Sequence, residues 1–224
     1  MAQTPRRVFF LIYDKVEMLD LAGPYEVFSM ANVVSGKVEF ELYTVSPDRD
    51  PQTASPRLVS PMRHAEAKSL GLELRATHAI DRCPDEAIDI LVIPGGDPRL
   101  MHEFKDKYPA VIEWIAGQRP KVSILATVCV GALIAARANV FDGLKATTHS
   151  GFIPVLRNLT SGGNTTVVDG VRFVDNDKPS HNVISSAGVS AGIDMALHIV
   201  GKLLGDAIRV GTATAMEYLL DRNT

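Results

Sequence analysis

The stretch ILATVCVGALIAA, residues 124–136, joins two hydrophobic patterns at a single cysteine. Up to Cys129 the run is short, apolar and rich in β-branched residues, which is typical of a strand buried on both faces. After Cys129, small residues follow at helical spacing from Gly131 onward. The pattern predicts a strand, a sharp turn and a helix. The cysteine in the turn is either a small core residue or a nucleophile held at the junction.

Similar apolar runs recur along the chain and alternate with helical patterns, which indicates βαβ units and a doubly wound α/β sandwich with a mostly parallel sheet. We expect one domain spanning residues 1–224. The expected strands are 7–13, 38–46, 87–93, 122–127, 144–149 and 181–188, and the expected helices are 20–34, 107–118, 131–138, 150–158 and most of 190–220, with a break near Gly205 or Gly211.

Two segments are less regular. Residues 46–56 form a polar, proline-rich loop, and the LVS (58–60) and LELRAT (72–77) runs after it can form a strand pair. Residues 165–177 carry Asp169-Gly170 between two alternating runs, which predicts a β-hairpin.

The overall composition excludes several classes of function. Net charge is −3 and the isoelectric point is about 6.1, so we expect no nucleic-acid partner and no binding to anionic membranes. The N-terminus lacks the features of a signal peptide, and no apolar run reaches the roughly 18 residues that span a bilayer. Two cysteines, Cys83 and Cys129, are a poor disulfide framework. We expect a cytoplasmic protein.

The chemistry is expected where strands end, because ligands of open parallel sheets sit outside the carboxyl ends of the strands. Three such loops are YDKVEMLD (13–20), PGGDP (94–98) and VCVG (128–131). A helix N-terminus next to Cys129 favours the thiolate, so we expect a pKa below the free-thiol value of about 8.5. The N–H groups of Gly95, Gly96 and Val130 can hold an oxyanion, although Gly-Gly is also typical of a tight turn.

Two acidic residues compete for the role of acid partner. Asp20 lies between Leu19 and Leu21 and is either a helix cap or a carboxyl group with a raised pKa. Glu17 follows a more polar stretch, where an ionised, solvated side chain is expected. His149 can exchange protons with a thiol or simply end a strand. The sequence shows no metal-ligand spacing, P-loop or dinucleotide fingerprint, so we expect neither a metal nor a cofactor.

Together these residues resemble the DJ-1/PfpI superfamily. The resemblance runs in order through residues 7–28, DILVIPGGDP (89–98), 123–136, KATTH (145–149) and 185–200. It implies a flavodoxin-like fold with a nucleophile elbow at Cys129, a small-molecule substrate and a homodimer formed around 7–13 and the first helix.

The branches of this superfamily differ at the residues around the cysteine. LDLAGP (19–24) and SAGID (190–194) resemble the isocyanide (isonitrile) hydratase branch, whereas the deglycase branch has Glu where this chain has Asp20. The protease-like branch has His at position 130, and the hydratase branch usually has Thr there and an aromatic residue at position 150; this chain has Val130 and Ser150.

The resemblance implies a hydratase that converts an isonitrile to an N-substituted formamide through a Cys129 thioimidate. In this interpretation Asp20 supplies the proton, and the N–H groups of Gly96 and Val130 hold the polar end of the intermediate. Two alternatives remain open at this point. One is a glyoxalase or deglycase that acts on α-oxoaldehydes, and the other is a non-catalytic ligand-binding or redox-sensing domain related to those of AraC-type regulators.

Overall fold

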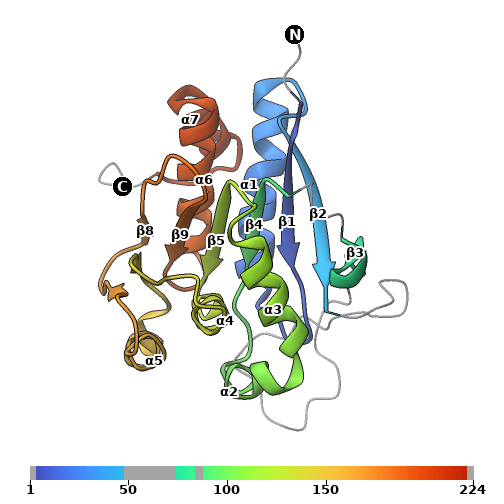
Figure 1. Cartoon of the computed structure of the whole chain (residues 1–224). Helices are drawn as coiled ribbons and strands as arrows, with labels where there is room; N and C mark the ends of the chain where they lie inside the picture. Colours follow the sequence, from blue (N-terminus) through green and yellow to red (C-terminus); the bar gives the residue numbers. More distant parts are fainter. Residues whose placement is uncertain (1–3, 48–73, 84–87, 221–224) are drawn as a thin grey trace, which may run out of the picture.

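The computed structural model describes residues 4–47, 74–83 and 88–220. Within these ranges a seven-stranded sheet forms the centre of the molecule, in the order β3-β2-β1-β4-β5-β9-β8 (Figure 1). All neighbouring strands run parallel except β8, which is antiparallel to β9. The strands are β1 (Arg6–Leu11), β2 (Phe40–Ser46), β3 (His78–Ala79), β4 (Ile90–Ile93), β5 (Ile124–Val128), β8 (Phe173–Asp175) and β9 (Asn182–Ser186).

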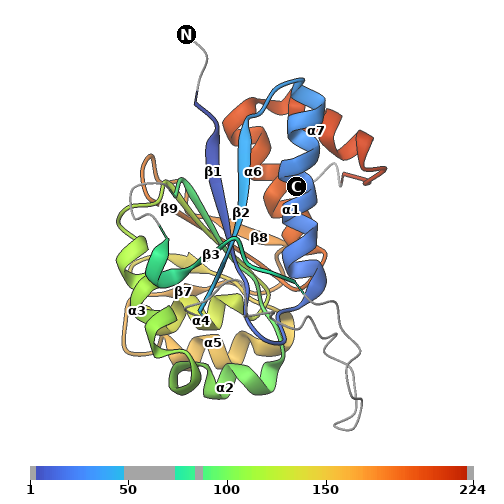
Figure 2. The same cartoon turned by 90° about the vertical axis from the view of Figure 1, so that its right-hand side faces the viewer.

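Helices cover both faces of this sheet. Figure 2 shows α1, α6 and α7 on one side and α2 to α5 on the other. This arrangement confirms the expected doubly wound, mostly parallel α/β sandwich. The helices are α1 (Met18–Ser35), α2 (Pro98–Lys107), α3 (Pro109–Gln118), α4 (Gly131–Arg137), α5 (Ile153–Leu159), α6 (Ala191–Leu204) and α7 (Asp206–Ala215), with short 3-10 turns η1 (Ile80–Arg82) and η2 (Ser150–Phe152).

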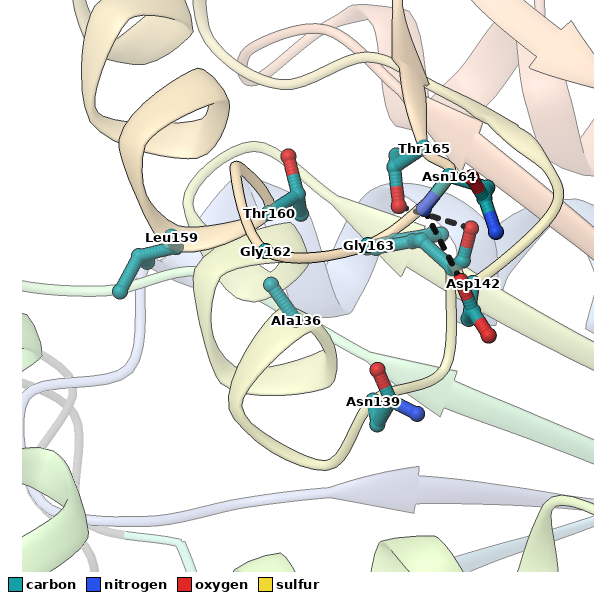
Figure 3. Close-up of a pocket in the computed structure, with 10 residues that line it drawn as sticks. Ala136, Asn139, Asp142, Leu159, Thr160, Gly162, Gly163, Asn164 and Thr165 are labelled. Carbon is teal, nitrogen blue, oxygen red and sulfur yellow. Dashed lines mark hydrogen bonds between the residues drawn. The ribbon is translucent and has the colours of Figure 1, made fainter.

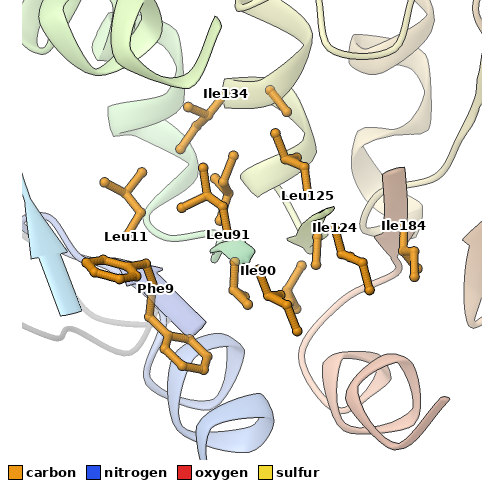
Figure 4. Packing of buried hydrophobic residues seen from close by; sticks show 14 of the residues in the cluster. Phe9, Leu11, Ile90, Leu91, Ile124, Leu125, Ile134 and Ile184 are labelled. Carbon is orange, nitrogen blue, oxygen red and sulfur yellow. The ribbon is translucent and has the colours of Figure 1, made fainter. Parts of the chain in front are cut away.

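The core lies on both faces of the central strands because neighbouring side chains of a strand point to opposite sides. Leu11, Leu91 and Leu125 pack toward Ile134 of α4, whereas Ile90, Ile124 and Ile184 point to the opposite face (Figure 4). All four residues of β4 are buried, as are all five of β5. Such two-sided burial explains why the sequence shows continuous apolar runs here rather than alternation.

The predicted hairpin at 165–177 is wrong. Its first strand, β7 (Thr166–Val167), pairs in parallel with β6 (Lys145–Ala146) in a separate two-stranded sheet, whereas β8 joins β9. Gly170 does turn the chain, with φ at +73° and its N–H bonded to the Asp169 side chain. Tertiary partners therefore override the local turn signal. The strand expected at 144–149 is likewise reduced to the two residues of β6.

The helix expected at 107–118 begins at Pro109, and α2 precedes it without having been predicted. Tyr108, as the residue before a proline, leaves the helical region (φ −132°, ψ 56°) and separates the two helices. Asp97 caps α2 by accepting the N–H of Arg99 at 2.9 Å, so Asp97-Pro98 was the missed signal.

Two further expectations concern the break in the C-terminal helical stretch and the irregular stretch from residue 46 to residue 77. The C-terminal helical stretch breaks at Gly205 (φ +90°), one of the two positions expected, and Gly211 lies inside α7. Most of the expected loop at 46–56 and the run at 58–60 lie outside the described residues, and residues 74–77 form no strand. Among the described helices, none has the length and apolar character needed to cross a membrane.

Candidate active site

The loops that follow β1, β4 and β5 meet at Gly95. Its N–H donates to Oδ2 of Asp20 at 3.0 Å, and its carbonyl accepts the N–H of Glu17 at 2.9 Å. A Cβ atom at this position would lie 2.7 Å from Asp20 Oδ2 and 2.9 Å from the main-chain nitrogen of Val130. Only glycine lets the three loops approach this closely. The convergence of these loops that the sequence led us to expect is therefore present.

Cys129 occupies a sharp turn between β5 and α4. Its φ is +57°, a left-handed conformation that is uncommon for a non-glycine residue and costs on the order of 1 kcal/mol. The turn is held by two hydrogen bonds: the Cys129 N–H donates to the Ala187 carbonyl at 3.1 Å, and the Thr148 hydroxyl donates to the Cys129 carbonyl at 2.8 Å. A Cβ on Gly131 would collide with the carbonyl of Ile93. This is the nucleophile-elbow geometry.

The Cys129 side chain is nearly enclosed, with 7% exposed. Burial raises the pKa of its thiol, and the nearby Asp20 carboxylate raises it further, so the expectation of a lowered pKa is wrong. The N–H groups of Val130 and Val189 face the sulfur and act in the opposite direction. They do not offset the loss of hydration, which is the larger effect for a thiolate in an apolar site.

Asp20 lies in the first turn of α1 rather than in the preceding loop, and its side chain is fully buried. Glu17 is the N-terminal boundary residue of the helix, so Asp20 is not the cap. Burial, with a smaller contribution from the charge of Glu17, raises the pKa of Asp20 to about 7. Its Oδ1 is buried without a hydrogen-bond partner among the described residues, which suits a protonated carboxyl group.

Asp20 and Cys129 form one coupled titrating pair, because each side chain shifts the pKa of the other. As the pH rises through about 7 the pair loses one of its two protons. Thiol with carboxylate is then the favoured arrangement, because the pKa of the thiol is raised above that of Asp20, and thiolate with carboxylic acid is the minor, reactive one. The site therefore combines a nucleophile with an acid.

Glu17 is not the solvated side chain that the sequence led us to expect. It is half-buried, burial raises its pKa, and its Oε2 is enclosed without a hydrogen-bond partner among the described residues. Because its charge helps to raise the pKa of Asp20, Glu17 acts on the pair through space.

The other candidate residues separate into two groups. Gly95 and Val130 border the Asp20–Cys129 pair, but the N–H of Gly95 already donates to Asp20. Gly96 instead forms a β-bridge with Val16, and a Cβ there would lie 2.6 Å from the Lys15 carbonyl oxygen. An oxyanion-binding role for Gly96 stays a prediction.

His149 packs against the Gly188–Val189 turn, which borders the site. Its Nδ1 accepts the N–H of Gly151 at 3.1 Å, and its ring packs against Gly188 and edge-on to Phe152. Its connection to the elbow runs through the preceding residue, Thr148, whose hydroxyl holds the Cys129 carbonyl.

Sequence reasoning missed three residues of this site. Thr148 was visible in the TTH motif but carried no distinguishing pattern. Val189 brings its N–H to both Asp20 and Cys129 through a left-handed turn (φ +50°) that nothing in its identity signals. Tyr13 ended an apolar run and resembled a core residue, yet its hydroxyl donates to the Pro94 carbonyl at 2.9 Å beside the pair.

Away from this site, a polar pocket of about 370 Å³ lies beyond the end of α4 (Figure 3). Asp142 on its wall accepts the N–H of Asn164 at 3.0 Å, so its carboxylate already serves the loop. Within the described ranges, no group of three or more His, Cys, Asp or Glu side chains is placed to hold a metal ion.

A doubly wound parallel sheet with a cysteine at the elbow after a central strand defines a flavodoxin-like α/β protein of the nucleophile-elbow type. The DJ-1/PfpI family model matches residues 6–202, and the chain belongs to this family.

Three relatives show the range within this family. Isonitrile hydratase of Pseudomonas putida is 27% identical over 96% of this chain and 78% of its own length. The HTH-type transcriptional regulator GbdR of Pseudomonas aeruginosa is 24% identical over 99% of this chain, which spans about half (53%) of that regulator. The crystal structure of a ThiJ/PfpI family protein from Pseudomonas syringae superposes with a TM-score of 0.75 at 22% identity, covering 99% of this chain and 78% of that one.

Proposed function

We propose that this protein is a cysteine-dependent hydratase that converts an isonitrile to an N-substituted formamide. The observation that carries the proposal is the buried Asp20–Cys129 pair, in which an acid with a pKa of about 7 is electrostatically coupled to the elbow thiol. The similarity to isonitrile hydratase over 96% of the chain supports it.

In the first half of the reaction, the thiolate form of Cys129 attacks the terminal carbon of R–N≡C and forms a C–S bond. Protonated Asp20 delivers its proton to the same carbon, which gives a thioimidate, R–N=CH–S–Cys129, and leaves Asp20 ionised. A carboxyl group with a pKa near 7 suits this role, because an acid is most effective when its pKa lies near the working pH.

In the second half, ionised Asp20 accepts a proton from water while the water oxygen adds to the thioimidate carbon. Asp20 passes the proton it took from water to the nitrogen. The C–S bond then breaks, the thiolate of Cys129 leaves, and Asp20 accepts the hydroxyl proton as the formamide carbonyl forms, which restores the starting state. The sum is R–NC plus water giving R–NH–CHO. The N–H groups of Val130 and Val189, which face the sulfur, stabilise the thiolate as it leaves.

A second candidate is a ligand-binding domain without turnover. The raised pKa of Cys129 keeps most of the thiol protonated in the resting protein, which suits binding better than fast nucleophilic attack. The regulator GbdR is similar over 99% of this chain. A glyoxalase or deglycase that acts on α-oxoaldehydes would use the same thiol and acid.

The test is turnover of cyclohexyl isocyanide and of methylglyoxal by the purified protein. We expect formamide formation that Cys129→Ala abolishes. Asp20→Asn should lower it by roughly 10²–10⁴, the contribution of a positioned acid, whereas Glu17→Gln should change it little. Cys129-dependent consumption of methylglyoxal alone would favour the glyoxalase. Binding of either compound without turnover would favour the ligand-binding domain.

A further inference from the structure

A single peptide unit lies between Tyr13 and Asp20. The Tyr13 hydroxyl donates to the carbonyl oxygen of Pro94 at 2.9 Å. The N–H at the other end of the same peptide, that of Gly95, donates to Asp20 Oδ2 at 3.0 Å. The phenol, the peptide and the carboxyl group therefore form one continuous chain of hydrogen bonds.

The two glycines of the Pro94-Gly95-Gly96 turn make this chain possible. A Cβ on Gly95 would lie 2.7 Å from Asp20 Oδ2, and a Cβ on Gly96 would lie 3.0 Å from the Tyr13 hydroxyl oxygen. The first distance is shorter than real side chains allow, and the second is tighter than most real contacts. The turn therefore has room for Asp20 on one side and for Tyr13, together with the Lys15 carbonyl 2.6 Å away, on the other.

Tyr13 is built to stay a hydrogen-bond donor. Its side chain is 1% exposed, and the ring of Phe104 packs edge-on against it with centroids 5.1 Å apart. Burial, followed by the nearby Asp20, raises the pKa of Tyr13 above its ordinary value. The phenol therefore remains protonated through the neutral range, in which Asp20 titrates.

We infer that Tyr13 is a positioning residue for Asp20, acting through the Pro94–Gly95 peptide. A donor on the Pro94 carbonyl polarises the peptide and strengthens the N–H bond to Asp20, because linked hydrogen bonds polarise one another. It also fixes the direction of that N–H. The Gly95 N–H favours the charged form of Asp20 and so opposes the effect of burial. The inference rests on the proposed function only in that Asp20 is the acid of that reaction.

Several titratable groups face this chain of bonds. Glu17, just before the helix, and Cys129 from the elbow face Asp20, and both Cys129 and Tyr108 face Tyr13. Tyr13 differs from these groups because it reaches Asp20 through a hydrogen-bonded peptide. Its phenol is neutral in this pH range, so removing the hydroxyl changes no charge. A shift in the Asp20 titration on its removal therefore reports the hydrogen-bond chain.

The test is the pH dependence of Cys129 carbamidomethylation by iodoacetamide, followed by peptide mass spectrometry, together with the ¹³C carboxyl shift of Asp20. For Tyr13→Phe we expect both midpoints to move up by about 0.2–0.5 pH unit, a fraction of an ordinary hydrogen bond, because the Gly95 N–H still donates to Asp20 and loses only its polarisation and fixed direction. The matched control is Tyr218→Phe, which removes a hydroxyl bonded to Asp194 at 2.8 Å on α6. It should leave both midpoints unchanged.

Should Tyr13→Phe fail to fold, 3-fluorotyrosine placed at position 13 gives the opposite test. Its phenol is a stronger donor, so both midpoints should move down. Midpoints that stay in place in a folded variant would overturn the inference and leave Tyr13 as a core residue. Neither readout uses an isonitrile, so absence of hydratase activity would not affect this result, and an unmoved midpoint would not affect the hydratase proposal.

Discussion

The Thr148 hydroxyl and the Cys129 carbonyl are joined by a buried hydrogen bond of 2.8 Å across 19 residues of sequence. The Cys129 carbonyl also accepts the N–H of Ala132 at 3.3 Å. The loop after β6 thus holds the left-handed residue that carries the thiol. This contact fixes the direction of the elbow without touching the sulfur.

Thr148→Val should therefore destabilise the fold and loosen the elbow. We expect a loss of about 1–2 kcal/mol in the free energy of unfolding, because one buried hydrogen bond is removed while Ala132 still serves the carbonyl. Urea denaturation measures it. Thr214→Val removes an exposed hydroxyl bonded to the Val210 carbonyl and should stay within about 0.5 kcal/mol of the parent. Equal losses in the two variants would contradict this role of Thr148.

Asp20 should make the stability of the fold depend on pH. Its pKa rises from an ordinary 3.8 to about 7 on folding, so folding favours the protonated form. The associated stability is fully present below pH 3.8 and is lost as the pH rises through about 7. Asp20→Asn removes this loss. The stability of the variant relative to the parent should therefore increase from pH 4 to pH 8, by up to about 4 kcal/mol. A difference that is constant with pH would show that Asp20 is ionised in the folded protein.

Gly95→Ala should damage the site where Gly117→Ala does not. The new methyl group at position 95 would meet Asp20 Oδ2 and the Val130 nitrogen inside normal contact distance, so we expect a loss of about 1–3 kcal/mol in stability and a lower rate of Cys129 alkylation. At Gly117, in α3, a Cβ meets open space, and Ala should be neutral or stabilising by about 0.5–1 kcal/mol. Unchanged alkylation in Gly95→Ala would mean that the turn adjusts freely.

We expect the protein to form a two-fold homodimer through α1. The part expected of residues 7–13 is wrong, because β1 lies in the middle of the sheet and its apolar side chains are buried. Several apolar side chains of α1 are exposed in the single chain, among them Met18 (42%), Tyr25 (37%) and Val33 (70%). Light scattering at micromolar concentration should give about twice the chain mass of 24.2 kDa. A particle that remains at the mass of one chain over a hundredfold range of concentration would rule the dimer out.

The sequence alone determined the architecture and the place of the nucleophile. The runs ILVI (90–93) and ILATV (124–128) are apolar except for one threonine because their strands are buried on both faces, a property that each strand carries in its own residues. Cys129 followed by Gly131 likewise marks the elbow in the sequence. The start of α4 passes the end of β4 so closely that only a glycine, which has no Cβ, fits at position 131. Gly205 breaks the C-terminal helix by its own conformational freedom.

Tertiary structure decided the partners and the protonation states. The Asp169-Gly170 turn formed, but the strands on either side of it paired with β6 and β9, because those longer-range partners satisfy their backbone groups. The direction of the Cys129 pKa shift reversed because burial by distant elements outweighs the local N–H groups. Tyr13 reaches Pro94 across 81 residues of sequence. Desolvation and hydrogen-bond partners depend on atoms that only the folded chain brings together, so no local pattern encodes them.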